Sequence, residues 1–330
     1  MTEFRAYRIP EEGGESDGGV RRTALAELPE GDVLIRSEWS SINFKDALAV
    51  TGKGKILRRF PLTPGIDVAG TVESSTASGI EPGQSVLVTG CGMGEVHDGG
   101  FAEYVRVPAE WVVPVPECYT TRQAMALGTA GFTAALALLR MESCGQTPER
   151  GDIVVTGASG GVGSLAVNML SSAGYRVVAV SGKPDAAEQL YHLGAADVVS
   201  PEELQLGTRP LEKARFGGVI DNVGGELLAS LLPHIHEYGN VAAIGLAGGV
   251  KVETTVMPFI LRGVSLLGIS SANCPRDLRL TAWRRLGADL RPPRLDEIVT
   301  GEVALDGLRE ASEAMLARRA RGRTLVRVRD

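Results

Sequence analysis

A glycine-rich stretch near the middle of the chain has the residue types and spacing of a phosphate-binding turn. Residues 152–166 read DIVVTGASGGVGSLA, in which Gly157, Gly160 and Gly163 recur at intervals of three. Apolar residues predict a strand before the glycines and a helix after them. Main-chain N–H groups at such a turn can approach a phosphate with no side chain in the way, at the positive end of the helix. The residues expected to contact the phosphate are Ser159, Gly160, Gly161 and Val162.

The surroundings of this turn favour a dinucleotide site. Its G-x-x-G-x-x-G spacing departs from the usual G-x-G-x-x-G, and glycine-rich turns are common in ordinary loops, so the spacing alone is a weak signal. A second expected strand ends about 20 residues further on, as the nucleotide-binding fold requires. The strand, turn, helix and second strand together predict dinucleotide binding.

The end of that second strand decides between the two nicotinamide dinucleotides. It reads Ser181-Gly182-Lys183 where an NAD enzyme places an Asp or Glu on the ribose 2′-hydroxyl. A hydroxyl and an ammonium can pair with a 2′-phosphate, which a carboxylate would repel. Asp185 follows Pro184, a typical first helical residue, so it suits the helix dipole instead. We expect NADP(H); the alternative for Lys183 is a solvated surface lysine.

Two further glycine-rich loops follow expected strands, at residues 221–225 (DNVGG) and 245–249 (GLAGG). The carboxyl ends of strands line the ligand crevice in a doubly wound sheet. We therefore expect Asn222 and Leu246 at the cofactor. Plain capping of helices and strands is the alternative, although it does not explain why the glycines repeat at strand ends.

The order of strand and helix patterns divides the chain into three stretches. Residues 1–121 contain short β-like runs between turn signals, which suggests an antiparallel barrel or sandwich. Residues 122–270 alternate Val- and Ile-rich strands with helices, as in a doubly wound parallel sheet. Residues 271–330 predict two helices and a final strand. A chain of this length suggests two domains.

Composition argues against several partners. The 330 residues carry a formal net charge of −6 without a long Lys/Arg block before the tail, so neither nucleic acid nor an anionic membrane is expected. No run reaches the ~20 unbroken apolar residues of a bilayer span, and the N-terminus lacks a signal-peptide core. The four cysteines have no C-x-x-C spacing, which argues against a disulfide framework and fits a reducing cytoplasm.

Five motifs in one order carry a resemblance to a known family. They are SSINFKDALAVTGKGKI (40–56), PGIDVAGTV (64–72), GTAGFTA (128–134), TGASGGVG (156–163) and TVMPFILRGV (255–264). From about residue 32 onward the chain resembles the zinc-free medium-chain dehydrogenases/reductases, in their quinone oxidoreductase branch, and there the acrylyl-CoA reductase family. The resemblance implies an α/β fold in which a GroES-like β-barrel domain is interrupted by a doubly wound parallel (Rossmann) domain.

The resemblance also implies metal-free chemistry. Zinc-bearing relatives have a Cys near Phe44 and Lys45, and a His-Glu pair where this chain reads Gly65-Ile66-Asp67. Neither ligand set is present, and the four histidines have no metal-binding spacing, so no metal is expected. Zinc-free members reduce a carbon–carbon double bond conjugated to a carbonyl: hydride goes to the β-carbon, and the enolate takes a proton at the α-carbon. The enolate oxygen needs hydrogen-bond donors.

Asn43 is the candidate for that polar work, with Asp46 orienting its loop; equally, both residues could simply cap the helix that follows. Phe44 stands where the family usually has a tyrosine, so its ring can stack beside the nicotinamide but supplies no hydroxyl. The proton donor is therefore unassigned, and water is an option. Further cofactor contacts implied by the resemblance are Thr129, Thr133, Ile269 and Arg323. The threonines could instead be helical core residues, and Arg323, matched to an arginine that reaches the pyrophosphate, could be one more member of a basic tail.

Four cations follow the expected catalytic loop: Lys53, Lys55, Arg58 and Arg59. They could bind the phosphates of an acyl-CoA, or they could form a solvated charged face. We expect an NADPH-dependent reductase of acrylyl-CoA or a similar short enoyl thioester. The alternatives are a quinone or enone reductase and, in another class, an NADPH-binding sensor without turnover. The resemblance further implies a homodimer through the strand GVSLLGIS.

Overall fold

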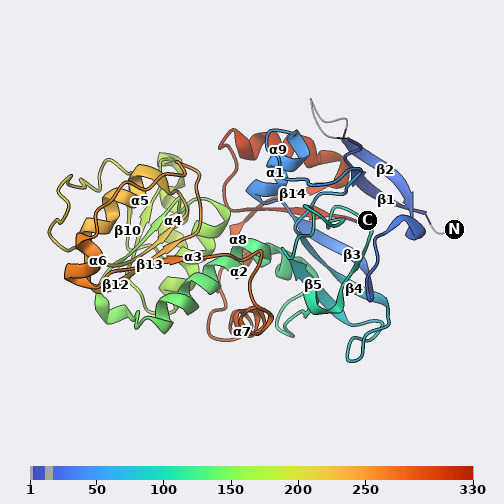
Figure 1. Cartoon of the computed structure of the whole chain (residues 1–330), viewed down its shortest axis with the longest axis horizontal. Helices are drawn as coiled ribbons and strands as arrows, with labels where there is room; N and C mark the ends of the chain where they lie inside the picture. The colour runs from blue at the N-terminus through green and yellow to red at the C-terminus, as the bar shows by residue number, and fades with distance from the viewer. Residues whose placement is uncertain (1–2, 12–17, 330) are drawn as a thin grey trace. The chain divides into compact units, whose positions relative to one another are not determined.

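The computed structural model describes residues 3–11 and 18–329, which fall into two compact units (Figure 1). Unit 1 comprises Met1–Ala130, Ser271–Gly287 and Leu295–Asp330, and unit 2 comprises Gly131–Ser270 and Ala288–Arg294. The chain therefore enters unit 2 inside helix α2 (Thr121–Ser143) and returns to unit 1 for its last helices and strands.

Unit 1 is built mainly of short strands separated by proline- and glycine-rich turns. Its larger sheet has the order β14-β15-β3-β4-β5-β7, with β6 also paired to β3, while β1 and β2 pair separately. All neighbours are antiparallel except β14 and β15. The strands are β1 (Glu3–Arg8), β2 (Gly19–Ala24), β3 (Val33–Ser41), β4 (Asp67–Ser75), β5 (Ser85–Thr89), β6 (Tyr104–Val107), β7 (Val113–Pro114), β14 (Val299–Ala304) and β15 (Arg323–Arg327).

Two apolar clusters of described residues pack the strands and helices of unit 1 together. One contains Val33, Ile35, Val68 and Val86 from the sheet, all fully buried or nearly so. The other packs α1 and α9 against the sheet around Ile42. The helices of this unit, besides the start of α2, are α1 (Phe44–Thr51), α7 (Arg276–Leu286), α8 (Leu295–Ile298) and α9 (Leu308–Leu316).

Unit 2 is a parallel sheet in which strands and helices alternate along the chain. Its order, β10-β9-β8-β11-β12-β13, is the 3-2-1-4-5-6 arrangement of a doubly wound sheet. Every residue of β8 and β9 is buried, which is why these strands read as continuous apolar runs. The strands are β8 (Ile153–Thr156), β9 (Val177–Val180), β10 (Asp197–Val199), β11 (Phe216–Asp221), β12 (Ile235–Ala243) and β13 (Ser265–Gly268). The helices, besides the end of α2, are α3 (Gly161–Ser172), α4 (Ala187–His192), α5 (Gly225–Leu231) and α6 (Met257–Arg262).

Helix α2 is long and apolar enough to cross a membrane by length and composition alone. However, 83% of its most apolar 18-residue window is buried inside the protein, as in a core helix. Its backbone is also broken at Gly128, where φ is 50° and ψ is −152°.

Candidate active site

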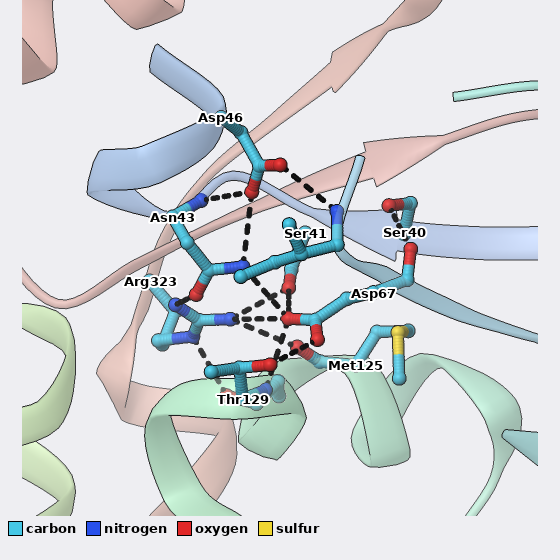
Figure 2. A network of polar contacts seen from close by, with 10 residues as sticks. Ser40, Ser41, Asn43, Asp46, Asp67, Met125, Thr129 and Arg323 are labelled. Carbon is cyan, nitrogen blue, oxygen red and sulfur yellow. Dashed lines mark hydrogen bonds and ion pairs between the residues drawn. The ribbon is translucent and has the colours of Figure 1, made fainter. Parts of the chain in front are cut away.

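A buried polar network in unit 1 is centred on the carboxylate of Asp67, at the start of β4 (Figure 2). Its Oδ2 accepts hydrogen bonds from Ser41 Oγ at 2.7 Å and Asn43 Nδ2 at 2.8 Å. Thr129 donates twice, from its backbone N–H to Oδ2 at 2.9 Å and from its hydroxyl to Oδ1 at 2.6 Å. The carboxylate is fully buried, and these donors replace the water that it loses.

Arg323 supplies the positive charge of the network. Its Nη2 lies 3.9 Å from Asp67 Oδ2 and donates to Ser41 Oγ at 2.7 Å. Nη1 donates to Asn43 Oδ1 at 3.3 Å, and Nε donates to the carbonyl oxygen of Ala126 at 3.0 Å. Burial lowers the pKa of this guanidinium, while the charges of the nearby carboxylates act the other way. Arg323 is 2% exposed and so forms part of the buried network; its expected contact with a pyrophosphate stays a prediction.

The break in α2 creates room for the network. A Cβ on Gly128 would lie 2.6 Å from Asp67 Oδ2 and 2.9 Å from Arg323 Nη2. Glycine is therefore required here both for space and for its positive φ. The break turns the next N–H, that of Thr129, toward Asp67.

Asn43 both caps a helix and joins the network. It precedes α1, and its backbone N–H donates to Asp46 Oδ2 at 2.9 Å, the return half of a capping box. Its amide group donates to Asp46 Oδ2 at 3.1 Å and to Asp67 Oδ2 at 2.8 Å. Both amide hydrogens are thereby engaged, so in this structure none is left over for an enolate oxygen. The contacts agree with the capping reading of Asn43, and its role as a donor to an enolate oxygen stays a prediction.

Asp46 is 1% exposed and lies beside this amide. Its Oδ1 accepts the backbone N–H of Ile66 at 2.9 Å, which ties α1 to the residue preceding Asp67. Burial, and then the charge of Asp67, raise the pKa of Asp46 to about 7, although N–H donors from Asn43 and Ile66 oppose the shift. Two carboxylates and one guanidinium share the network, so protonation of Asp46 removes its excess negative charge.

The neighbouring residues of α1 and the following loop are more exposed. Phe44, the first residue of α1, is 49% exposed, and Lys45 forms an ion pair with Glu95 at 2.8 Å. The cations expected to bind substrate all lie on the surface: Lys53, Lys55, Arg58 and Arg59. Their role as a phosphate site stays a prediction.

Unit 2 carries the glycine-rich turn between β8 and α3. A Cβ on Gly163 would lie 2.3 Å from the carbonyl oxygen of Gly157, so glycine is needed for the helix to pack this close to the turn. An α-helix leaves the N–H groups of its first turn without helical partners, and here they belong to Gly161, Val162 and Gly163. This bare N-terminus fits a phosphate.

The expected 2′-phosphate residues lie directly beside this turn. Ser181 follows β9 and donates from its hydroxyl to Ser159 Oγ at 3.1 Å. The Ser181 hydroxyl also accepts the backbone N–H of Lys183 at 3.2 Å. A Cβ on Gly182 would meet nothing within 4 Å, so the space beside the turn is open.

A second buried carboxylate fixes the loop after β11. Asp221 accepts the Thr156 hydroxyl at 2.6 Å and the backbone N–H of Gly224 at 2.7 Å, and burial raises its pKa. Thr156 in turn accepts the Asn222 N–H on Oγ1 at 2.9 Å, and its carbonyl oxygen accepts from Asn222 Nδ2 at 2.8 Å. The Asn222 side chain is thereby held beside the end of β8, and its Oδ1 is buried without a partner.

The remaining expected cofactor residues differ in exposure. Thr133 is 4% exposed, Leu246 is 60% exposed, and Ile269 is half-buried with its N–H bonded to the Ala243 carbonyl oxygen. Ser41 and Asp67 belong to the network but are not among the site residues predicted from the sequence. The available signal for Asp67 was an acidic residue directly before the apolar residues Val68 and Ala69 of a strand.

Two family models match the chain. The alcohol dehydrogenase GroES-like domain matches residues 29–117, and the zinc-binding dehydrogenase model matches residues 161–287. Acrylyl-CoA reductase AcuI of Ruegeria pomeroyi is 44% identical over 319 residues, 96% of each chain. The chain belongs to the medium-chain dehydrogenase/reductase family, in its acrylyl-CoA reductase branch.

Solved structures of this branch agree with the fold. The Escherichia coli K-12 protein YhdH, solved with bound NADPH, is 48% identical and has a TM-score of 0.94 over 98% of this chain and 100% of that one. Bacillus subtilis YhfP, whose name refers to quinone oxidoreductase activity, is 45% identical over 99% of each chain. Its structure was solved with NAD bound and gives a TM-score of 0.96 over 99% of this chain and 100% of that one. The predicted combination of a GroES-like domain and a Rossmann domain is confirmed.

The residues of this reductase-family member do not fit the zinc named in the second family model. Within residues 3–11 and 18–329, no group of three or more His, Cys, Asp or Glu residues could hold a metal ion. Asp67, the acidic residue that follows Gly65 and Ile66, is bonded to N–H and O–H donors instead.

The raised pKa of Asp46 predicts a pH-dependent stability. Between pH of about 4, where a free Asp titrates, and about 7, the folded protein holds a proton that the unfolded chain releases. The free energy of unfolding should therefore fall as pH rises through this window, by up to about 4 kcal/mol. Urea unfolding at pH 5 and pH 8 measures the difference.

Asp46→Asn should lower stability at both values but reduce the difference between them by at least about 1 kcal/mol. The control is Asp277→Asn, at an exposed aspartate of the same unit. An unchanged pH difference in Asp46→Asn would show that Asp46 titrates normally.

Proposed function

We propose that this protein is an NADPH-dependent reductase of short enoyl thioesters, acrylyl-CoA or a close analogue. The observation that carries the proposal is the Ser181–Lys183 turn beside the bare N-terminus of α3, which suits a phosphate and has no carboxylate. The family membership, with AcuI and the NADPH-bound YhdH as relatives, points the same way. Bound NADPH supplies the hydride that goes to the β-carbon.

The chain's own residues divide the work of binding. We assign the main-chain N–H groups of Gly161 and Val162 to the pyrophosphate, whereas the Gly160 N–H is already bonded to the Gly157 carbonyl oxygen at 3.0 Å. The hydroxyls of Ser159 and Ser181, which bond to each other, are assigned to the phosphates of the cofactor. Asn222, held by Thr156, lies at the neighbouring strand end for the ribose. Thr133, Leu246 and Ile269 are assigned to the nicotinamide side of the cofactor.

The polar network fixes the residues of unit 1 that we assign to the reaction. Asp67 and Arg323 fix Asn43 from both ends of its amide, and Asn43 begins the helix whose first residue is Phe44. The exposed Phe44 ring is the surface that we assign to the nicotinamide. The raised pKa of Asp46, about 7, lowers the negative charge of the network behind Asn43 as the pH falls below neutrality.

Acyl-CoA chemistry and quinone chemistry can be separated by removing the nucleotide end of the substrate. NADPH oxidation should be fast with acrylyl-CoA and at least about tenfold slower in kcat/KM with the acrylyl thioester of pantetheine, because remote contacts contribute binding energy at the reacting centre. Equal turnover of 1,4-benzoquinone would favour the quinone reductase that the name of YhfP suggests. NADPH binding with no oxidation of any of these substrates would favour a sensor.

The choice of cofactor depends on Lys183. Lys183→Ala should weaken NADPH binding by about tenfold or more, the effect of losing one charge-assisted hydrogen bond, and leave NADH binding unchanged. Isothermal titration calorimetry measures both affinities. Lys251→Ala, at an exposed lysine of the same unit, is the control. Equal binding of NADH and NADPH by the unaltered protein would overturn the assignment.

We further propose a homodimer formed through the β13 edge of unit 2. β13 is the last strand of its sheet, and Leu266 on it is 41% exposed. On α6, Ile260 and Leu261 are 72% and 57% exposed, and Val250 and Val256 in the preceding loop are also exposed. An apolar surface beside an unpaired strand edge is typical of an association site.

The free cysteines fit the cytoplasmic location that we propose.

Ile260→Glu should convert the dimer to a monomer, because burying a carboxylate in an apolar interface is costly. Sedimentation equilibrium measures the change. Val96→Glu, at a valine of unit 1 that is 53% exposed, should leave the association state unchanged. A monomeric unaltered protein, or a dimer that survives Ile260→Glu, would refute this interface.

A further inference from the structure

Unit 1 has a hollow of about 310 Å³ that the proposed reaction does not use. It is lined by Arg36, Glu38, Trp39, Arg327 and Arg329. Three of these five residues are arginines, and none belongs to the Asp67 network. The volume is within the range of small-molecule sites.

The pairing of three strands gathers these residues. Trp39 of β3 lies opposite Arg327 of β15, and the N–H of Val328 bonds to the Glu38 carbonyl oxygen. The pairing of β3 with β4 shifts register between Ser37 and Trp39, the kind of bulge that re-aims side chains. The guanidinium group of Arg329, just after β15, lies over the ring of Tyr104 in β6.

Arg329 is held in place but keeps unused donor capacity. Its guanidinium carbon lies 4.6 Å from the centre of the Tyr104 ring, and its Nη2 donates to the Glu103 carbonyl oxygen at 3.0 Å. Its Nε is buried and has no hydrogen-bond partner. The residue as a whole is only partly buried, and it lines the hollow.

Glu38 and Glu73, two glutamates beside the arginines of the hollow, already have partners of their own. The two oxygens of Glu38 accept hydroxyls, from Thr71 at 2.8 Å and Thr121 at 2.6 Å. Arg36 lies 3.8 Å from Glu73, and both side chains are about half exposed, so this pair contributes little. Among the residues that line the hollow, three carry a guanidinium group and one, Glu38, carries a carboxylate.

Trp39 gives the hollow an aromatic wall. The guanidinium carbon of Arg122 lies 5.9 Å from the centre of the Trp39 ring, and Arg122 is itself paired with Asp296 and Glu302. A low-polarity wall strengthens the attraction between an arginine and an anion beside it.

We propose that this hollow binds a phosphate monoester. Guanidinium groups recognise phosphate oxygens through paired hydrogen bonds, and a doubly charged phosphate makes better use of three arginines than a carboxylate does. The monoester could be the 3′-phosphate of a CoA substrate or part of a separate phosphorylated metabolite. Only the first source rests on the proposed function.

The hollow lies close enough to the Asp67 network for one CoA molecule to reach both. Thr121 at the start of α2 bonds to Glu38, and Ala126 in the same helix accepts from Arg323. Five helical residues span about 8 Å at 1.5 Å per residue. The pantetheine and diphosphate arm of CoA is longer than this.

Binding is tested on the full chain with adenosine 3′,5′-bisphosphate and with inorganic phosphate, by calorimetry and by tryptophan fluorescence. We expect a saturable fluorescence change that Trp39→Phe abolishes. Arg329→Ala and Arg36→Ala should each weaken binding by tenfold or more. Glu38→Gln should tighten it, because the opposing charge is lost.

Arg22→Ala provides the matched control, since it removes one exposed arginine of unit 1 whose ion pair, with Glu3, is long. It should change the affinity by less than twofold. The proposal is overturned if neither probe binds, or if Arg36→Ala and Arg329→Ala weaken binding no more than Arg22→Ala does. Arg36 is exposed, so its removal keeps the test valid even if Arg329→Ala fails to fold.

The two sources are distinguished by kinetics with acrylyl-CoA and its 3′-dephospho form. If the hollow holds the CoA phosphate, dephosphorylation should raise KM with little change in kcat, and Arg36→Ala should abolish that difference. If calorimetry shows arginine-dependent phosphate binding while KM is the same for both substrates, the ligand is a separate metabolite. Absence of reductase activity would defeat the proposed function and leave the calorimetric result standing.

Discussion

The buried pair of Asp67 and Arg323 is the interaction on which the architecture of unit 1 depends. Isolated burial of either charge would cost several kcal/mol, and their separation of 3.9 Å alone would not repay it. The hydroxyl of Ser41 closes the gap, since it accepts from Arg323 and donates to Asp67. The amide of Asn43 also bridges the two charges, since its oxygen accepts from Arg323 and its nitrogen donates to Asp67. The pair therefore works as a fully bonded network, and it links β3, β4, β15 and α2.

The break in α2 at Gly128 follows from that network. A continuous helix would keep the N–H of residue 129 inside its own hydrogen-bond ladder and would fill the space beside Asp67. With the ladder interrupted, Thr129 donates two hydrogen bonds to the carboxylate. The helix then continues into unit 2, so one local irregularity serves the polar site without ending the element.

In unit 2 the same problem of buried polar groups is solved without a cation. Asp221 has no positive partner among its bonds: it is held by a threonine hydroxyl and by backbone N–H groups of the loop that it shapes. The cost of burying this carboxylate without a cation appears as a raised pKa of Asp221. Its hydrogen bonds fix the loop at the carboxyl end of β11. A doubly wound sheet binds ligands at the loops that follow these strand ends. The buried carboxylate of Asp221 therefore fixes a loop at which a ligand is expected.

The sequence by itself determined the elements whose signals are local. Three features depend on residues close together in the chain: the glycine turn, the alternation of strands and helices, and the Ser181–Lys183 turn. The apolar strands could be predicted because strands buried on both faces consist of continuous apolar residues. Tertiary structure alone decided what Asn43 does, since its amide is shared between Asp46 and Asp67 from different elements. It also decided that Arg323 is a buried partner of Ser41, 282 positions away, and that Arg327 and Arg329 gather around Trp39. Such contacts leave no periodic trace in a sequence, because charge pairing acts through space and the sheet alone determines which distant residues become neighbours.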